Sequence, residues 1–538
     1  MSNTNTVPAL LLRAAEAHAD NESFVFPGSR QSYAELLSAA TDVAAALTAM
    51  GIGKGDAVGA LMPNCQEFTY VLFGAALAGA TFVPFNARLA PRELAYVVPD
   101  SGVRVLFTTD VVDEHVDYVS RLYDALPGLA EARGSERPAP DLAPALERVV
   151  LFGGRTRGGL MPRSEFLAQG HSVDRQRIRD NALAVAPQDP YIMMYTSGTT
   201  SMPKGCPLSH RSVVELGVAV GEEGFGITEA DRMWNPLPMF HVSAQAPMIA
   251  VLNAGATYIS TVHFDVEEAL ASIVAESATI AYPAYPTLTG PMLESDSYRP
   301  ETFAKVRALL TVGPPDVLRR YQALLPYTSH VSCYGSTETG GVAVMGRLDA
   351  PLEQRLTCGR PFTGVEISIR DLVDRVQVPA GVTGEIHVRG YNLFLGYHND
   401  PQKTAASIDA AGWFATGDLG SVDEEGNLTF QGRAKDMLKV GGENVGCLEV
   451  ETFLLGHPDV IMSAVVGMPD PKYGEVPAAF VELRSGAAVT AAELIEYCAK
   501  GMAKYKVPRQ VEMITEWPMS ATKIQKGRLL ERLKPPVG

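Results

Sequence analysis

Short apolar runs alternate with longer helical segments along the first half of the chain. The runs are rich in β-branched residues and end abruptly in small or polar residues, near Val58, Val83, Leu106 and Leu151. Between them, segments such as YAELLSAATDVAAALTAMG place alanine and leucine at helical spacing. Strands that alternate with helices predict an α/β fold in which a largely parallel sheet is covered on both faces. Ligands are then expected at the carboxyl ends of the strands.

A second, smaller domain is predicted around the string GRAKDM, which begins at Gly432. The sequence beyond it contains its own strands, SAVVGM and AAFVEL, and its own helix, AAELIEYCAKGMAKY, enough for a compact domain of about 100 residues. Because 538 residues are too many for one ordinary core, we predict an N-terminal domain over 1–434 and a C-terminal domain over 435–538. The Pro-, Gly- and Arg-rich stretch 127–190 is interpreted as surface excursions.

The composition narrows the classes of function. The formal net charge of −16 argues against broad nucleic-acid binding, which needs a basic surface. The N-terminal segment lacks the order of a secretory signal and no apolar stretch has the length of a membrane span, so we expect no transmembrane segment and a cytoplasmic protein. The six cysteines lie far apart and are expected to be free thiols. The oligomeric state stays open, a homodimer included.

A polar string follows the apolar strand that begins at Tyr191. The string TSGTTSMPKG combines small hydroxyl residues, glycine and one lysine, so its backbone amides and hydroxyls can surround a phosphate. It is not the P-loop pattern, because no Gly-Lys-Ser/Thr opens a helix here. A surface loop without a ligand is the ordinary alternative. The candidate phosphate-binding residues are Thr196, Ser197, Gly198, Thr199, Thr200 and Lys204.

A second predicted strand is followed directly by the polar string YGSTETGG. Thr337 can donate to a phosphate oxygen, and Glu338 is a hard oxygen ligand suited to Mg²⁺, which usually takes one or two carboxylates together with substrate phosphates. A lone glutamate in a loop is ordinarily solvated. The magnesium hypothesis therefore depends on the phosphate-binding string nearby.

Two further strings complete the candidate chemistry. Asp418, in GWFATGDLG, is a plausible acceptor for two ribose hydroxyls, and Arg433 can hold the same ribose from the far side. TGD alone is a common turn. Lys523, in MSATKIQKGRLLERL, precedes a basic helix whose ordinary interpretation is a solvated face.

Together the four strings resemble the acyl-adenylate-forming superfamily, which includes acyl-CoA synthetases, firefly-type luciferases and the adenylation domains of peptide synthetases. The resemblance covers nearly the whole chain, with the motifs in the family's order. It implies a large N-terminal domain with two αβ sheets and a small β-barrel, and a small mobile α+β C-terminal domain. It also implies ATP, Mg²⁺ and coenzyme A as cofactors and a small-molecule carboxylic acid as the partner.

The resemblance implies roles for the matching residues. In such enzymes the 196–205 loop handles the β- and γ-phosphates, Thr337 contacts the α-phosphate and Glu338 binds Mg²⁺. Asp418 and Arg433 correspond to the ribose contacts. The rest of the implied nucleotide site comprises Gly313, Pro314, Tyr334, Gly335 and Ser336. The Gly-Pro-Pro run at Gly313 departs from the family, which usually has more alanine and glycine there.

Lys523 corresponds to the catalytic lysine of the adenylation step, where its charge bridges the carboxylate and the α-phosphate. By analogy, the C-terminal domain then turns about Lys435, removes Lys523 and brings Gly441 and Gly442, with Lys439 beside them, to the site. Residues without side chains suit a narrow tunnel for pantetheine, whose thiol attacks the acyl carbon. These are two half-reactions in one active site.

The acid is expected to be hydrophobic. Relatives that activate amino acids place an aspartate near Val242, where this chain is apolar, and we expect no carrier-protein domain after the C-terminal domain. His241 corresponds to a residue beside the acyl carboxylate, although a lone histidine is more often structural. The implied acyl pocket comprises Val242, Ser243, Ala281, Tyr282, Gly313, Gly335, Gly340, Gly341 and Val342. These are mostly small or apolar, so a fatty, aryl or alicyclic acid fits.

The predicted function is therefore an ATP-dependent acid–thiol ligase that makes acyl-CoA through an acyl-adenylate and releases AMP and pyrophosphate. Three alternatives stay open. In the first, the enzyme passes its acyl-adenylate to a carrier protein. In the second, it forms only the thioester, from a preformed acyl-adenylate. In the third, the chain is a non-catalytic nucleotide sensor. The joint presence of Lys204, Glu338, Asp418, Arg433 and Lys523 argues against the sensor, because binding alone does not need Lys523.

Overall fold

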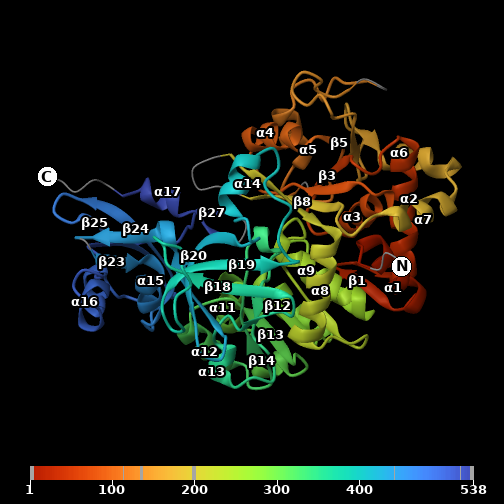
Figure 1. The fold of residues 1–538 in the computed structure, drawn as a ribbon. Coiled ribbons are helices and arrows are strands. Elements are labelled where there is room, and N and C mark those ends of the chain that lie inside the picture. Colours follow the sequence, from red (N-terminus) through yellow and green to blue (C-terminus); the bar gives the residue numbers. More distant parts are fainter. Residues whose placement is uncertain are drawn as a thin grey trace.

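The computed structural model describes residues 5–112, 114–133, 137–196, 202–441, 443–520 and 523–533, with the backbone alone at positions 444, 520 and 523. Two seven-stranded sheets and their helices form the larger, N-terminal part, and a smaller sheet from the end of the chain lies beside it (Figure 1, blue). The predicted α/β fold with a smaller C-terminal domain is confirmed.

The first large sheet contains the strands predicted from the apolar runs. Its order is β7 (Met161–Pro162), β6 (Arg148–Leu151), β5 (Val103–Thr108), β3 (Ala57–Leu61), β4 (Thr81–Pro84), β8 (Pro190–Thr196) and β9 (Lys204–Ser209). Neighbouring strands are parallel except for the β8–β9 hairpin. The sheet is therefore largely parallel, as expected.

The second large sheet is buried on both faces. Its order is β14 (Ser329–Val331), β13 (Ala308–Thr311), β12 (Ile280–Ala284), β10 (Arg232–Trp234), β11 (Thr257–Ile259), β1 (Glu22–Phe26) and β2 (Ser29–Ser32). Successive side chains of a strand point to opposite faces, so Ile280 packs into the core between the two sheets and Ala281 packs into an outer core. Helices α10 (Val266–Ala275), α11 (Pro286–Glu294) and α12 (Pro315–Leu324) complete the outer core.

Five helices contribute to the core that the two large sheets share. They are α1 (Val7–Ala17), α2 (Tyr33–Ala49), α3 (Gln66–Ala78), α8 (His210–Ala219) and α9 (Val242–Ala254). Helix α2 begins with a capping box, in which Ser32 Oγ accepts from the Glu35 amide and the Glu35 carboxylate accepts from the Ser32 amide. A Cβ at Gly74 of α3 would lie 2.6 Å from Val43 Cγ1 of α2, so glycine permits this close crossing.

The stretch 127–190 is more ordered than its composition suggests. Besides β6 and β7 it forms α6 (Arg163–Gln169) and α7 (Arg175–Ala184), and α7 buries Ile178 and Ala182 against α2 and α3. Two short helices that precede this stretch, α4 (Pro91–Ser101) and α5 (Tyr118–Ala125), pack on each other. Helices with so few apolar residues give a weak periodic signal, which explains the difference from the expectation.

Antiparallel strands form a third unit of the N-terminal part. One sheet holds β15 (Cys333–Tyr334), β16 (Val344–Met345) and β17 (Arg360–Pro361), and the other holds β18 (Val365–Arg370), β19 (Gly384–Gly390), β20 (Phe414–Val422) and β21 (Leu428–Arg433). A bridge between Gly359 and Leu428 joins the two sheets. They correspond to the small β-barrel that the resemblance implied.

The C-terminal part has its own core. Its sheet has the order β23 (Glu443–Gly446), β22 (Met437–Val440), β25 (Gly474–Leu483) and β24 (Val460–Asp470), and β26 (Gln510–Met513) also pairs with β25. Helices α15 (Cys447–Leu455), α16 (Ala491–Gly501) and α17 (Lys526–Leu530) belong to this part, as does the hairpin of β27 (Met519–Ser520) and β28 (Lys523–Ile524). An ion pair of 2.9 Å between Arg484 and Glu294 joins it to the N-terminal part.

Two expectations about the chain's surroundings can be compared with this fold. None of the helices in the described ranges combines the length and the apolar run that a membrane crossing needs. All six cysteines are free, as predicted, and the structure buries each of them.

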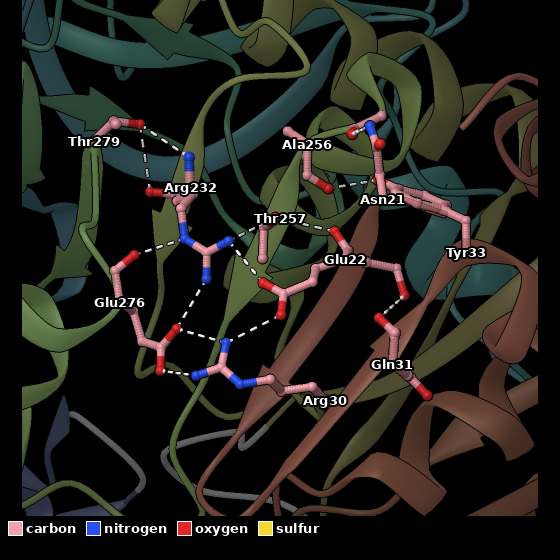
Figure 2. Close-up of polar contacts among 12 residues, drawn as sticks. Asn21, Glu22, Arg30, Gln31, Tyr33, Arg232, Ala256, Thr257, Glu276 and Thr279 are labelled. Carbon is pink, nitrogen blue, oxygen red and sulfur yellow. Dashed lines mark hydrogen bonds and ion pairs between the residues drawn. The ribbon is translucent and has the colours of Figure 1, made fainter. Parts of the chain in front are cut away.

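A network of charges ties the N-terminal hairpin to the second sheet (Figure 2). Arg232 of β10 contacts the carboxylates of Glu22 and Glu276, each at 2.8 Å, and Arg30 of β2 contacts the same two carboxylates. Two guanidinium groups thus share two carboxylates between β1, β2, β10 and the end of α10. Charge-assisted hydrogen bonds of this kind fix the relative positions of the strands.

Replacing Arg232 by methionine is expected to lower the free energy of unfolding by about 2 kcal/mol, because both carboxylates lose a partner while the apolar stem is kept. Urea unfolding followed by circular dichroism measures the loss. Arg319→Met on α12 is the matched control, since the partners Asp316 and Glu353 are exposed and a surface pair contributes little. Equal losses in both variants would contradict a stabilising network.

The buried ring of His330 on β14 makes the fold sensitive to acid. Both ring nitrogens lack a hydrogen-bond partner among the described residues, and burial, followed by the nearby Arg355, lowers the pKa of His330 to about 3. Below its ordinary pKa of 6.5 the unfolded chain therefore takes up a proton that the folded chain does not. The stability contributed by neutral His330 is complete above pH 6.5 and is lost as the pH falls towards 3.

His330→Leu is expected to flatten this dependence. Between pH 6.5 and pH 5 the wild-type chain should lose about 2 kcal/mol more unfolding free energy than the variant, since each pH unit in this window corresponds to about 1.4 kcal/mol. Urea unfolding at pH 7, 6 and 5 gives the two slopes. Parallel slopes would show that His330 titrates alike in both states.

Candidate active site

The strand pair β8–β9 presents the first polar string. Thr196 at the end of β8 pairs with Lys204 at the start of β9, and the hydroxyl of Tyr195 donates to Asp100 at 2.6 Å. The predicted residues Ser197, Gly198, Thr199 and Thr200 lie outside the described residues. Thr196 and Lys204, at the two ends of the predicted phosphate loop, are thus paired at the carboxyl end of β8. The sequence predicts ligands at the carboxyl ends of the strands.

Glu338 lies close to this hairpin. It belongs to the short 3₁₀ helix η4 (Thr337–Thr339), which packs against β9. Burial raises the pKa of the Cys206 thiol on β9, and the carboxylate of Glu338 raises it further, whereas Lys204 opposes this. The structure therefore brings the first and second polar strings together around Glu338, Cys206 and Lys204.

Asp418 of the third polar string contacts Tyr334 of the second. The hydroxyl of Tyr334 donates to Asp418 Oδ2 at 2.8 Å, and Arg433 Nε lies 3.2 Å from Asp418 Oδ1. Asp418 and Arg433 are paired in register between β20 and β21, and the ring of Tyr334 stacks on Phe430 of β21. Burial and the Asp418 charge raise the pKa of Tyr334 far above its usual value, so the phenol stays a donor. Asp418 is thereby held at a fixed position and buried.

The predicted adenine loop lies at the carboxyl ends of two neighbouring strands. Gly313 follows β13, and Pro314 caps the start of α12. A Cβ at Gly313 would lie 3.4 Å from Pro286 Cγ, and the Val312 amide donates to Ala284 O at 2.9 Å. The loops after β12 and β13 therefore lie side by side, as parallel strands dictate.

Several predicted acyl-pocket residues lie together. A Cβ at Gly341 would come within 3.2 Å of Val242 Cγ2, and one at Gly335 would lie 2.3 Å from Gly341 O. Gly340 faces Leu216 of α8 in the same way.

His241 occupies the position before α9, where its ring contacts Phe240, and Val242 and Ser243 open that helix. Together with the three glycines, these residues form an apolar, glycine-rich wall next to the Ser336–Glu338 turn.

Ala281 and Tyr282 do not share a surface. Tyr282 packs in the core between the sheets with Phe225 and next to Cys333, whereas Ala281 packs in the outer core with Trp234. Of the two, Tyr282 is on the side of the glycine-rich wall. Val342 follows Gly341 and is buried.

The C-terminal residues of the prediction are distributed over three places. Lys435 lies in the 3₁₀ turn η5 (Ala434–Asp436) between the two parts, and burial followed by the charge of Arg433 lowers its pKa. Lys439 is exposed on β22, and Gly441, with φ +61°, donates its amide to Tyr473 O at 2.9 Å. Gly442 lies outside the described residues. The backbone of Lys523 begins β28 opposite Ser520, and its side chain is outside the described atoms.

A residue that the sequence prediction missed contacts Glu338. Tyr397, in the loop between β19 and α14 (Pro401–Ser407), donates its hydroxyl to Glu338 Oε1 at 3.0 Å. A tyrosine in a loop, here one of two with Tyr391, carries no sequence signal of such a contact. The preceding Gly396, with φ +115°, was the available hint of a shaped turn.

The residues present fit a nucleotide and a hard cation. Ser336 Oγ, two residues before Glu338, is buried without a hydrogen-bond partner among the described residues. No group of three or more His, Cys, Asp or Glu side chains in the described ranges is arranged to hold a metal. A single carboxylate, with phosphate oxygens as the other ligands, is the arrangement that Mg²⁺ commonly accepts.

Comparison with known proteins agrees with this geometry. The AMP-binding enzyme family matches residues 11–398, and the AMP-binding enzyme C-terminal domain matches residues 449–523. The chain is 33% identical to the methyl-dioxo-octahydroindenyl-propanoyl:CoA ligase of Mycobacterium tuberculosis, over 99% of both chains. It is 30% identical to the mitochondrial medium-chain acyl-CoA ligase of Danio rerio, over 99% of this chain and 89% of the relative.

Solved structures give the same result. ATP-bound MatB from Rhodopseudomonas palustris is similar with a TM-score of 0.83 and 26% identity, over 99% of both chains. The matches span both parts of the chain and include relatives above 30% identity along its whole length. The chain therefore belongs to the AMP-binding enzyme family, within the acyl-adenylate-forming superfamily, and is an acyl-CoA synthetase, a ligase that forms thioesters of coenzyme A.

Proposed function

We propose that this enzyme activates a hydrophobic carboxylic acid, which is a fatty, aryl or alicyclic acid, and joins it to coenzyme A. ATP and the acid give an acyl-adenylate and pyrophosphate, and the thiol of coenzyme A then displaces AMP. The observation that carries the proposal is the cluster of Tyr334, Asp418 and Arg433 beside an apolar, glycine-rich wall. The proposal puts the ribose against Asp418 and the acyl group against the apolar, glycine-rich residues beside it.

The nucleotide roles follow from the chemistry of each side chain. Asp418, held by Tyr334 and Arg433, would accept hydrogen bonds from the ribose hydroxyls. Ser336 Oγ and the hydroxyl of Thr337 would donate to the α-phosphate, which supplies Ser336 with the partner it lacks. Thr196 and Lys204 would hold the ends of the loop around the β- and γ-phosphates.

Mg²⁺, held by Glu338, would neutralise charge on the phosphates during the attack. Lys523 would lie between the acid's carboxylate and the α-phosphate, where a fixed positive charge stabilises the charge that develops as the carboxylate oxygen attacks phosphorus. His241, at the start of α9, would lie beside the same carboxylate.

The glycine-rich wall supports a hydrophobic acid. Val242 and Leu216 face Gly341 and Gly340, so apolar atoms cover backbone that carries no side chain of its own. Relatives of this chain are named for a bicyclic propanoic acid and for medium-chain acids, which are both largely apolar. Burial of apolar area would contribute about 25 cal/mol per Å² to acid binding.

The second half-reaction needs a different arrangement of the C-terminal part. We propose that the boundary lies at Lys435 and that this part turns there, so that Gly441 and Gly442 replace Lys523 at the site. The separate core of residues 437–533 supports movement as one body. Rotation about a short turn between two cores is a common hinge arrangement.

The experiment that tests the proposal incubates the enzyme with ATP, Mg²⁺, coenzyme A and a panel of fatty, aryl, alicyclic and amino acids. Mass spectrometry then detects acyl-CoA and AMP. We expect thioester from one hydrophobic class and none from amino acids. Absence of thioester from every acid, also when synthetic acyl-adenylates are supplied, would refute the proposal.

A further inference from the structure

The segment 394–399 joins the two polar strings of the active site. The Phe394 amide donates to Glu338 O at 2.9 Å. The Leu395 amide donates to Pro207 O at 2.8 Å, and the His398 amide donates to Gly205 O at 2.9 Å. One short segment is thus bonded both to the turn that carries Glu338 and to the strand that follows the phosphate loop. Anything fixed to this segment is fixed relative to both.

Tyr397 is held within this segment on three sides. Its amide donates to Thr404 Oγ1 at 2.8 Å, and its ring makes a T-shaped contact with Phe394, with centroids 4.8 Å apart. Lys403 Nζ lies over the ring, 4.6 Å from its centroid. The half-buried phenol therefore has little freedom to move, and its hydroxyl donates to Glu338 Oε1 at 3.0 Å.

The two carboxylate oxygens of Glu338 differ in their hydrogen bonding. Oε1 accepts from Tyr397, and Oε2 has no hydrogen bond to any residue of the described ranges. A glutamate side chain in a turn has several staggered rotamers of similar energy. A donor held by its own ring contacts selects one of them.

We propose that Tyr397 is a positioning residue for magnesium binding, which orients Glu338 so that Oε2 is presented to the cation that accompanies ATP. The inference rests on the proposed role of Glu338. Mg²⁺ requires nearly ideal octahedral geometry, so a carboxylate that wanders between rotamers binds it poorly. Outer partners of metal ligands commonly change metal affinity by about 10- to 100-fold when they are removed.

Tyr397→Phe isolates the hydroxyl, because phenylalanine keeps the contacts with Phe394 and Lys403. Calorimetric titration of ATP into the enzyme, with excess Mg²⁺ and separately with EDTA, measures how much the metal tightens ATP binding. We expect Tyr397→Phe to reduce this gain by about 10-fold while the affinity in EDTA is unchanged. Tyr391→Phe is the matched control, since it removes a half-buried phenol from the same loop at a position beside Gly364, and it should behave as the wild type.

The Glu338→Gln background tests whether the Tyr397 hydroxyl acts through the Glu338 carboxylate. In that background, adding Tyr397→Phe should cause no further change in the metal-dependent gain, because the two residues act as one unit. Equal weakening with and without Mg²⁺, or an unchanged gain in Tyr397→Phe, would overturn the inference. So would a wild-type enzyme whose ATP affinity does not respond to Mg²⁺.

The proposed function and the positioning role of Tyr397 are refuted by different results. If no acid yields thioester while ATP binding still tightens with Mg²⁺ and loses that gain in Tyr397→Phe, the positioning role stands and the ligase substrate is wrong. If thioester forms and the gain is the same in both proteins, the ligase stands and the positioning role is wrong.

Discussion

Lys523→Ala is expected to slow acyl-adenylate formation by about 100- to 1,000-fold, because removal of one preorganised charge from a transition state costs about that much. ATP should still bind. Thioester formation from a synthetic acyl-adenylate should continue at close to the wild-type rate, since that step does not need Lys523 at the α-phosphate. Pyrophosphate release measures the first step, and acyl-CoA formation from the synthetic adenylate measures the second.

The local structure makes this variant informative. The β27–β28 hairpin that carries Lys523 is anchored at both ends, by the Trp517 indole, which donates to Glu482 at 2.6 Å, and by an ion pair of 2.6 Å between Lys526 and Glu451. Removing the Lys523 side chain leaves both anchors intact. The exposed Lys500→Ala is the control and should keep both rates. Wild-type pyrophosphate release in Lys523→Ala would exclude the lysine from the first step.

The large sheets could be predicted because their signals are local. Each run around Val58, Val83, Leu106 or Leu151 is a short apolar stretch that ends in polar residues, which suffices to identify a strand buried on both faces. Helices α6 and α7 were not predicted within 127–190. Their few buried residues, such as Ile178, do not rise above a background rich in arginine and glycine.

Candidate site residues were identified by motif, and their contacts were not. The sequence singled out Tyr334, Asp418 and Arg433, yet nothing in it indicated that the Tyr334 phenol donates to Asp418, 84 residues away. Such a contact depends on how β15 meets β20. The orientation of Ala281 and Tyr282 is a different case, because the twofold period of a strand already implies that neighbours face opposite sides.

Tyr397 shows the limit of reading motifs. Its proposed role depends on a single hydroxyl 3.0 Å from Glu338, across 59 residues of sequence. A tyrosine in a loop is common, and neither its spacing nor its neighbours set it apart. Only the path of segment 394–399 past both strings brings the phenol to the carboxylate.

Asp418→Asn is expected to weaken ATP binding by about 10- to 100-fold. The substitution keeps the size of the side chain and removes its charge, so charge-assisted hydrogen bonds to the ribose become ordinary ones, a loss of about 1.5–3 kcal/mol. The wild-type enzyme should also bind ATP more tightly than 2′-deoxy-ATP, and Asp418→Asn should reduce that preference. Calorimetric titration with both nucleotides measures the two effects.

The second of these effects separates ribose recognition from a general disturbance of the site. Loss of the ion pair with Arg433 alone would weaken both nucleotides equally and leave their ratio unchanged. Asp423→Asn is the matched control, because Asp423 follows the same strand and is exposed, and its carboxylate accepts hydrogen bonds only from the turn residue Asn427 among the described residues. It should leave both affinities as they are. An unchanged ratio in Asp418→Asn would mean that the ribose contact lies elsewhere, and Asp418 would then serve only to hold Tyr334 and Arg433 in place.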